Sequence, residues 1–272
     1  MATVVSMINM KGGVGKTTLT FNLSWYCAVK ARLRVLVIDL DPQANLSQYF
    51  MGAERYLSYI QNDSATVVNI FNEPVLSAYR ECIYYVQDYY GITLHLIASR
   101  LELAWSLINP KHKIEQTPPQ FLSAVNNYYD LIIIDCAPTE SILTTAAYKS
   151  SRYVVVPVKP EFLAAIGLPL LGKSLNKYCS INKNQKLEIA GIIFNDHNKD
   201  MSPEEITSCR SVRNIAKNYG WKVFKSTVHR SRSFSTGSRA TQPIFNTSGA
   251  HTSVKDNFDK VAEEFLQAVK LR

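Results

Sequence analysis

Near its start the chain carries two lysines in one glycine-rich run, NMKGGVGKTT at residues 9–18. The run departs from the standard phosphate loop G-x-x-x-x-G-K-[ST], and what fits is G-G-V-G-K-T at 12–17. Glycines let backbone N–H groups turn inward around phosphate oxygens, and a helix beginning near Gly15 would point its positive dipole end at the same place. Lys16 would reach the β- and γ-phosphates, and the Thr17 hydroxyl would ligate Mg²⁺. The predicted phosphate-binding residues of the loop are Gly12, Gly13, Val14, Gly15, Lys16, Thr17 and Thr18.

Three carboxylates follow two apolar runs and complete such a site. Asp39 and Asp41 come at the end of RVLVIDL (34–40) and just beyond it, and Asp135 ends LIIID (131–135). Residues two apart in extended chain point the same way, so Asp39 and Asp41 can both reach beyond the carboxyl end of their strand. Open α/β sheets bind ligands at that edge. We therefore predict that Thr17, Asp39 and Asp135 surround the metal ion.

The rest of the chain supplies the elements that would position these residues. Short apolar runs alternate with helical patterns, which favours a mostly parallel, twisted α/β sheet with helices on both faces. No internal repeat or low-complexity linker interrupts the pattern, and we expect a single α/β domain over 1–272 without an N-terminal helix-turn-helix domain. The predicted strands are 3–8, 34–40, 93–99, 131–135, 153–158, 189–194 and 222–228.

Two helices can be predicted from the last third of the sequence. Ser202-Pro203-Glu204-Glu205 reads as a capping box, and Gly220 would end the helix that it starts. Its core face would carry Ile206, Cys209, Val212, Ile215 with Ala216, and Tyr219. A final helix over about 254–270 has an apolar stripe, but acidic residues on it would be repelled by anionic lipid.

Composition narrows the class of protein. Hydrophobic residues make up 46% of the 272 residues and charged residues 19%, as in ordinary globular proteins. The longest apolar runs are too short to span a bilayer, the N-terminus lacks a signal-peptide pattern, and we expect a cytoplasmic protein without stable membrane insertion. Five scattered cysteines form no C-x-x-C pair, which argues against a disulfide framework or a zinc site within one chain.

The net charge of +8 is concentrated in one segment. Residues 206–255 contain nine lysines or arginines and no aspartate or glutamate. Such a segment suggests a polyanionic partner, and nonspecific DNA binding needs phosphate contacts rather than a base-reading motif. The predicted DNA-binding residues are Arg210, Arg213, Lys217, Lys222, Lys225, Arg230, Arg232, Arg239 and Lys255.

With K-G-G-V-G-K-T-T, D-L-D-P-Q-A-N and I-I-D-C-A-P in this order, the chain resembles the ParA family of partition ATPases, relatives of MinD and of nitrogenase iron protein. The resemblance covers nearly the whole chain and implies a P-loop NTPase fold of the deviant Walker A type. It implies ATP/ADP and Mg²⁺ as ligands, and a homodimer that forms on ATP binding and binds DNA nonspecifically. A ParB-like or other adaptor protein would stimulate hydrolysis to ADP and phosphate. Such a protein would be nucleoid-associated and would partition or position plasmids, chromosomes or other cargo.

The resemblance also implies roles for single residues. Lys11 would cross the dimer interface to the nucleotide phosphates of the second subunit, much as an arginine finger does. Asp41 would orient the attacking water, Asp39 would support the metal site and Asp135 would be the Walker B acid. The catalytic residues would then be Lys11, Lys16 and Asp41. Adenine contacts would come from Pro160, Glu161 and the neighbourhood of Asn195.

Two alternatives use the same phosphate loop. A MinD-like membrane-associated positioning ATPase would need a short basic amphipathic tail, which VKDNFDKVAEEFLQAVKLR matches poorly. An iron–sulfur reductase like nitrogenase iron protein would bridge a dimer through cysteines. Cys136 and Cys82 are the candidates, but neither lies in a glycine-flanked context.

Overall fold

A computed structural model describes residues 1–72, 79–105 and 117–272. Its frame is an eight-stranded sheet in the order β3-β4-β2-β5-β1-β6-β7-β8, in which every neighbouring pair is parallel except β3 with β4. This confirms the predicted α/β class. The strands are β1 (Thr3–Met7), β2 (Val35–Leu40), β3 (Ile83–Tyr89), β4 (Ile92–Ile97), β5 (Leu131–Cys136), β6 (Tyr153–Val158), β7 (Glu188–His197) and β8 (Val228–His229).

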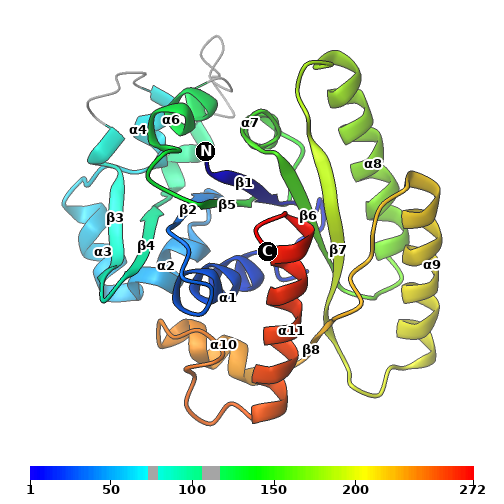
Figure 1. Ribbon diagram of the computed structural model, residues 1–272. Helices are drawn as coiled ribbons and strands as arrows, with labels where there is room; N and C mark the ends of the chain where they lie inside the picture. Colours follow the sequence, from blue (N-terminus) through cyan, green and yellow to red (C-terminus); the bar gives the residue numbers. More distant parts are fainter. Residues whose placement is uncertain (73–78, 106–116) are drawn as a thin grey trace.

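Helices cover both faces of this sheet and enclose two apolar cores (Figure 1). One core lies between the sheet and the helices α4 (Val67–Asn72), α6 (Thr117–Val125), α7 (Ile142–Ser150), α8 (Ala164–Ile181) and α9 (Pro203–Tyr219). The other lies under α1 (Lys16–Val29), α2 (Asn45–Met51), α10 (Arg232–Arg239) and α11 (Thr252–Ala268). The other helices in the described part of the chain are α3 (Ala53–Gln61) and a 3-10 turn at Leu101–Ala104.

The central strands are apolar on both sides because both sides are covered. Every residue of β2, β5 and β6 is buried, including Asp39 and Asp135. Parallel strands covered by helices lose the polar alternation of a sheet with one wet face. β5 and β6 flank β1, and β2 lies next to β5, so the carboxyl ends of the three strands meet near the loop that leaves β1.

The capping box of α9 is confirmed. The Ser202 side chain accepts from the Glu205 backbone, the Glu205 side chain accepts from the Ser202 backbone, and Gly220 ends the helix with φ +70°. The predicted core face is wrong at Ile206, which is 47% exposed. Cys209, Val212 and Ala216 of that face are buried, and Ser208 takes the place of Ile206 on the first buried turn.

Two strand assignments differ from the sequence prediction. Residues 222–228 form only a bridge at Val223 and the two-residue β8, because the Lys225 and Ser226 backbone N–H groups donate to the Glu264 carboxylate of α11 instead of to a neighbouring strand. β3 was not predicted. It joins β4 through the two-residue turn Tyr90-Gly91, both at positive φ, which is a hairpin geometry.

The apolar stripe of α11 belongs to the core, as its Phe258, Val261 and Phe265 are fully buried. That face is therefore not available to a membrane surface. Among the described residues, no helix combines the length and the apolar character needed to cross a membrane.

Candidate functional site: a phosphate loop at the carboxyl ends of the strands

The glycine-rich run forms a loop between β1 and α1. The Lys16 ammonium lies inside it and donates to the carbonyl oxygens of Asn9 and Lys11, both at 3.0 Å. Gly15 precedes the helix at φ +89°, and a Cβ there would lie 2.0 Å from Asn195 Nδ2. The same Nδ2 donates to the Val14 carbonyl at 2.8 Å. Only glycine fits this position, and Asn195 of β7 fastens the loop to the sheet.

The three predicted carboxylates lie together beside the first turn of α1. Asp39 and Asp135 face each other as register partners on β2 and β5. The Thr17 hydroxyl donates to Asp135 Oδ2 at 2.7 Å. Asp39 is held by Ser47 of α2, whose backbone N–H and hydroxyl donate to Oδ2 at 2.8 and 2.7 Å. Asp41 lies beyond the strand end, half-buried, with Oδ1 accepting from the Gln43 N–H at 2.9 Å.

Burial of these charges shifts their titration. Desolvation, reinforced by the neighbouring Asp39 charge, raises the pKa of Asp135 to about 8. Desolvation also raises the pKa of Asp39 to about 7, against the hydrogen bonds from Ser47. Burial lowers the pKa of Lys16, and Asp135 works against that shift. Burial thus disfavours the ionised form of both carboxyls, and a bound cation would favour that form.

The donor set fits a hard cation carried in by a nucleotide. Within the described residues, no three acidic, histidine or cysteine side chains gather in a way that could hold a metal by themselves. Thr17 and Asp135 offer oxygen ligands, because Asp135 accepts from the Thr17 and Thr20 hydroxyls, whereas both Asp39 oxygens accept from backbone N–H groups. Mg²⁺ usually takes one or two protein oxygens and completes its shell with phosphate and water. Thr17 and Asp135 would thus hold the ion, and Asp39 would support the metal site without binding the ion directly.

Of the residues predicted to contact adenine, Asn195 lines the cavity at the loop, whereas Pro160 and Glu161 do not. Asn195 is buried and lines a cavity of about 340 Å³ beside the loop, with Gly13, Gly15 and Thr18. Pro160 is buried and does not line that cavity. The Glu161 carboxylate is paired with Lys11 and Lys159.

The nine predicted DNA-binding residues do not form one surface. Arg210, Arg213 and Lys217 are exposed on α9, whereas Arg232 and Arg239 are on α10, across the sheet (Figure 1). Lys222, Lys225 and Arg230 lie between these faces, at the β8 edge, and Lys255 lies at the start of α11, on the same face as α10.

Two of these arginines lie at the nucleotide side. Arg230 and Arg232 line the cavity beside the loop, and Arg230 Nε is 3.2 Å from Asp196 Oδ1. The basic segment is therefore acid-free in sequence but not in space. Substitutions of Arg230 or Arg232 would disturb the loop cavity as well as any nucleic-acid contact.

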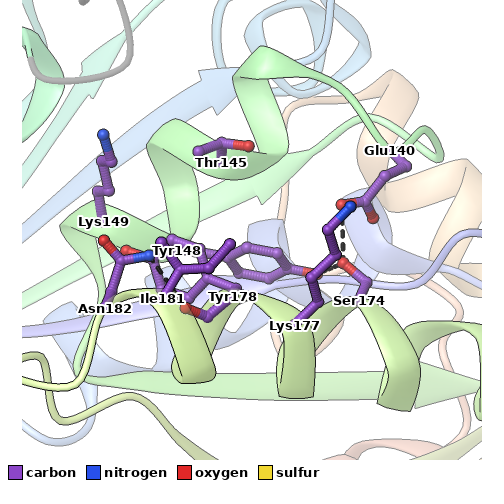
Figure 2. A pocket seen from close by; sticks show the side chains of 9 residues that line it. All are labelled: Glu140, Thr145, Tyr148, Lys149, Ser174, Lys177, Tyr178, Ile181 and Asn182. Carbon is purple, nitrogen blue, oxygen red and sulfur yellow. Dashed lines mark hydrogen bonds between the residues drawn. The ribbon is translucent and has the colours of Figure 1, made fainter.

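A second cavity, of about 350 Å³, lies between α7 and α8 (Figure 2). Its polar groups are matched within the chain, as Ser174 donates to Glu140 at 2.7 Å and lies 3.3 Å from the Tyr148 hydroxyl. None of the predicted site residues lines it. The cavity at the phosphate loop is therefore the candidate site.

The cysteines proposed for an iron–sulfur cluster are not accessible. Cys82 and Cys136 are 1% and 2% exposed, and burial raises the pKa of Cys82 to about 11. A cluster that bridges two subunits needs exposed thiolates, so these two positions do not suit one.

Sequence reasoning missed several residues that hold the site. Asn9 donates to the Pro157 carbonyl at 2.7 Å and accepts from the Lys11 N–H at 2.9 Å. Ser47 holds Asp39, and Lys159 and Asp196 form ion pairs near the loop. Lys159 could have been found from its place just after a strand next to β1, where the carboxyl ends meet. No spacing rule identifies Ser47, eight residues from its partner.

Comparison with known proteins gives a consistent result. The family model of the AAA domain matches residues 2–189. The sporulation initiation inhibitor protein Soj of Bacillus subtilis is 29% identical over 250 residues, covering 90% of each chain. The chromosome-partitioning ATPase Soj of Treponema pallidum is 27% identical over 269 residues, covering 98% of each. A variant of McdA from Cyanothece, solved as its ATP complex, shares the fold with a TM-score of 0.80 at 18% identity, over 97% of this chain and 96% of that one.

Proposed function

The chain belongs to the ParA family of AAA-domain ATPases, and from this premise we propose that it is an ATP-switched dimer that binds DNA nonspecifically. It is an ATPase of the class that partitions or positions cellular cargo. In the proposed cycle, MgATP joins two copies face to face, and the dimer binds duplex DNA. A ParB-like or other adaptor protein then stimulates hydrolysis and releases the dimer. The whole of 1–272 acts as one ATPase domain in this proposal.

The observation that carries the proposal is the convergence of four strand ends on one loop. β1 leads into the loop, β2 and β5 bring Asp39 and Asp135 to its side, and β7 brings Asn195 to Gly15. Backbone N–H groups, one buried lysine and the start of α1 supply positive charge at one point. The carboxylates supply the place for a cation next to it. This combination suits a nucleoside triphosphate with Mg²⁺.

The chain's own residues act mainly by position and charge. Lys16 would offset the growing charge on the β- and γ-phosphate oxygens. Mg²⁺, when bound, supplies further charge neutralisation at the phosphates. Asp41 is held beyond the strand end by the Gln43 N–H, where its free oxygen can orient a water in line with the γ-phosphate. Orientation rather than proton abstraction is the role expected of an ordinary carboxylate.

The proposed DNA contacts centre on the β8 edge. Lys222 and Lys225 are exposed there, neither forms an ion pair within the described part of the chain, and neither lines the loop cavity. Lys222 and Lys225 lie between the basic side chains of α9 on one face of the sheet and those of α10 on the other. A duplex that follows this edge can contact phosphates with both sets, which needs no base-reading helix.

We expect the Lys222→Glu, Lys225→Glu double variant to lose at least tenfold in affinity for nonspecific duplex DNA in ATP. Each lost phosphate contact should also reduce the salt slope by about one. Fluorescence anisotropy of a labelled duplex, measured at several salt concentrations in ATP and in ADP, gives both quantities. ATP binding should be unchanged, because neither lysine lines the loop cavity.

The matched control is Lys183→Glu with Lys186→Glu, which changes the net charge equally. These exposed lysines precede β7, at the amino ends of the strands. The control should keep its DNA affinity to within about twofold. Equal wild-type binding in ATP and ADP would contradict the switch, and equal losses in both double variants would contradict the β8-edge surface.

A further inference from the structure

One carboxylate next to the phosphate loop is shared by two lysines. Glu161, just after β6, forms an ion pair with Lys11 of the loop and another with Lys159, whose Nζ is 3.0 Å from Oε1. Lys159 in turn lies 2.9 Å from Asp196 Oδ2. The three side chains at the centre are partly covered, at 26% exposed for Lys11, 40% for Glu161 and 23% for Lys159.

The backbone aims this carboxylate at the loop. The Glu161 N–H donates to the Lys159 carbonyl at 2.8 Å, and its own carbonyl accepts from the Ser208 hydroxyl of α9 at 2.8 Å. On the other side, Asn9 fixes the Lys11 backbone. Both ends of the Lys11–Glu161 pair are therefore held by buried structure, unlike two flexible side chains that meet on an open surface.

We propose that Glu161 is a positioning residue that holds Lys11 on its own chain and so sets the ATP and protein concentrations at which the dimer forms. The inference rests on the proposed function, in which Lys11 contacts the nucleotide of a second copy. One ammonium group cannot stay on Glu161 and also lie on the second copy's phosphates. The ion pair must break as the dimer forms, and its strength opposes assembly.

Moving the Lys11 ammonium from Glu161 to the phosphates of the second copy costs little free energy, because Glu161 keeps Lys159 as a partner. When Lys11 leaves, Lys159 remains at the same carboxylate, so no charge is left alone. A partly exposed ion pair contributes little free energy, and the phosphates of a nucleotide offer Lys11 more negative charge than one carboxylate does. Glu161 thus adjusts the threshold for assembly without blocking it.

Lys11 and Lys159 compete for the Glu161 carboxylate, so the proposal predicts opposite changes in dimerisation when Glu161 or Lys159 is replaced. Both lower the pKa of Glu161, Lys11 more than Lys159. Removing the carboxylate frees Lys11 and should favour the dimer. Removing Lys159 leaves Glu161 to Lys11 alone, strengthens that pair and should disfavour the dimer. A role of either residue in folding alone would not produce opposite shifts.

The test is the protein concentration at half-dimerisation in AMPPNP and Mg²⁺, measured by sedimentation velocity on the full chain. Glu161→Gln should lower this concentration by about two- to fivefold, and Lys159→Gln should raise it by a similar factor. Two controls match the charge changes. Glu188→Gln removes a carboxylate paired with Arg152, and Lys30→Gln removes a lysine paired with Asp259, both away from the loop.

Shifts of the same sign in the two variants, or shifts no larger than those of the controls, would overturn the proposal. The Lys11→Ala variant separates this failure from that of the proposed function. If Lys11→Ala dimerises like wild type, the role of Lys11 across the interface is wrong. If Lys11→Ala fails to dimerise while Glu161→Gln and Lys159→Gln match their controls, only the role of Glu161 is wrong. Thermal unfolding of each variant checks that it is folded.

Discussion

Asp41→Ala is expected to slow ATP hydrolysis at least a hundredfold while leaving ATP binding and dimerisation in place. Asp41 lies beyond β2 and its carboxylate accepts from the Gln43 N–H, outside the phosphate loop, so its loss leaves the hydrogen bonds of the phosphate cradle intact. What is lost is the orientation of the attacking water, and positioning of this kind accounts for factors of a hundred or more. ATP affinity should be equal or higher, because a negative charge near the phosphates is removed.

The measurement is phosphate release at saturating ATP, with nucleotide affinity from isothermal titration. Asp256→Ala is the matched control, as this exposed aspartate lies on α11 away from the loop. Its turnover should equal that of wild type. Normal turnover in Asp41→Ala would remove Asp41 from the mechanism, and lost ATP binding would assign it to the binding site instead.

Lys11→Ala is expected to bind ATP within about threefold of wild type but to lose dimerisation and at least a hundredfold in turnover. The loop uses the Lys11 backbone, whose carbonyl accepts from Lys16 and whose N–H donates to Asn9, and alanine keeps both. The ammonium group itself points away from this cradle to Glu161. A cation supplied by a second subunit at a transferring phosphoryl group contributes 10³- to 10⁵-fold in related chemistry.

Sedimentation velocity in AMPPNP and phosphate release in ATP test the two parts separately. Lys30→Ala is the control, a lysine at the far end of α1. An ATP-dependent dimer with unchanged hydrolysis in Lys11→Ala would contradict the role across the interface. A complete loss of ATP binding would show that Lys11 serves its own chain.

The sequence predicts the central sheet well because its strands are buried on both faces. β2, β5 and β6 read as uninterrupted apolar runs, and the glycines and Lys16 fix the loop between β1 and α1. The edges are less predictable, since an edge strand is set by its neighbours. The backbone of 225–226 pairs with a carboxylate of α11, forty residues away, and no local pattern reveals this. The glycine of the Tyr90-Gly91 turn could have indicated a hairpin and therefore β3, which the pattern of apolar residues alone does not reveal.

The same distinction applies to the site. The loop and its carboxylates are local motifs at strand ends, so their assembly follows from the topology. The division of the basic segment between two faces is not local, because it depends on the path of the chain around the β8 edge. The Lys11–Glu161–Lys159 contacts join residues about 150 positions apart and could be found only in three dimensions.

In the proposed dimer, each ATP site is completed by Lys11 of the other subunit. Mixing two inactive variants tests this arrangement. Lys11→Ala and Asp41→Ala chains are each nearly inactive alone. In a mixed dimer, the site with an intact Asp41 receives an intact Lys11 from the other subunit, so one complete site forms. Mixing equal amounts should therefore restore hydrolysis well above that of either chain alone. Random pairing, in which half of the dimers are mixed and half of their sites complete, would give about a quarter of the wild-type rate, and the weaker pairing of Lys11→Ala chains keeps the rate below this limit. If the mixture stays as inactive as its two components while both chains bind ATP, Lys11 acts within its own subunit and the account is wrong.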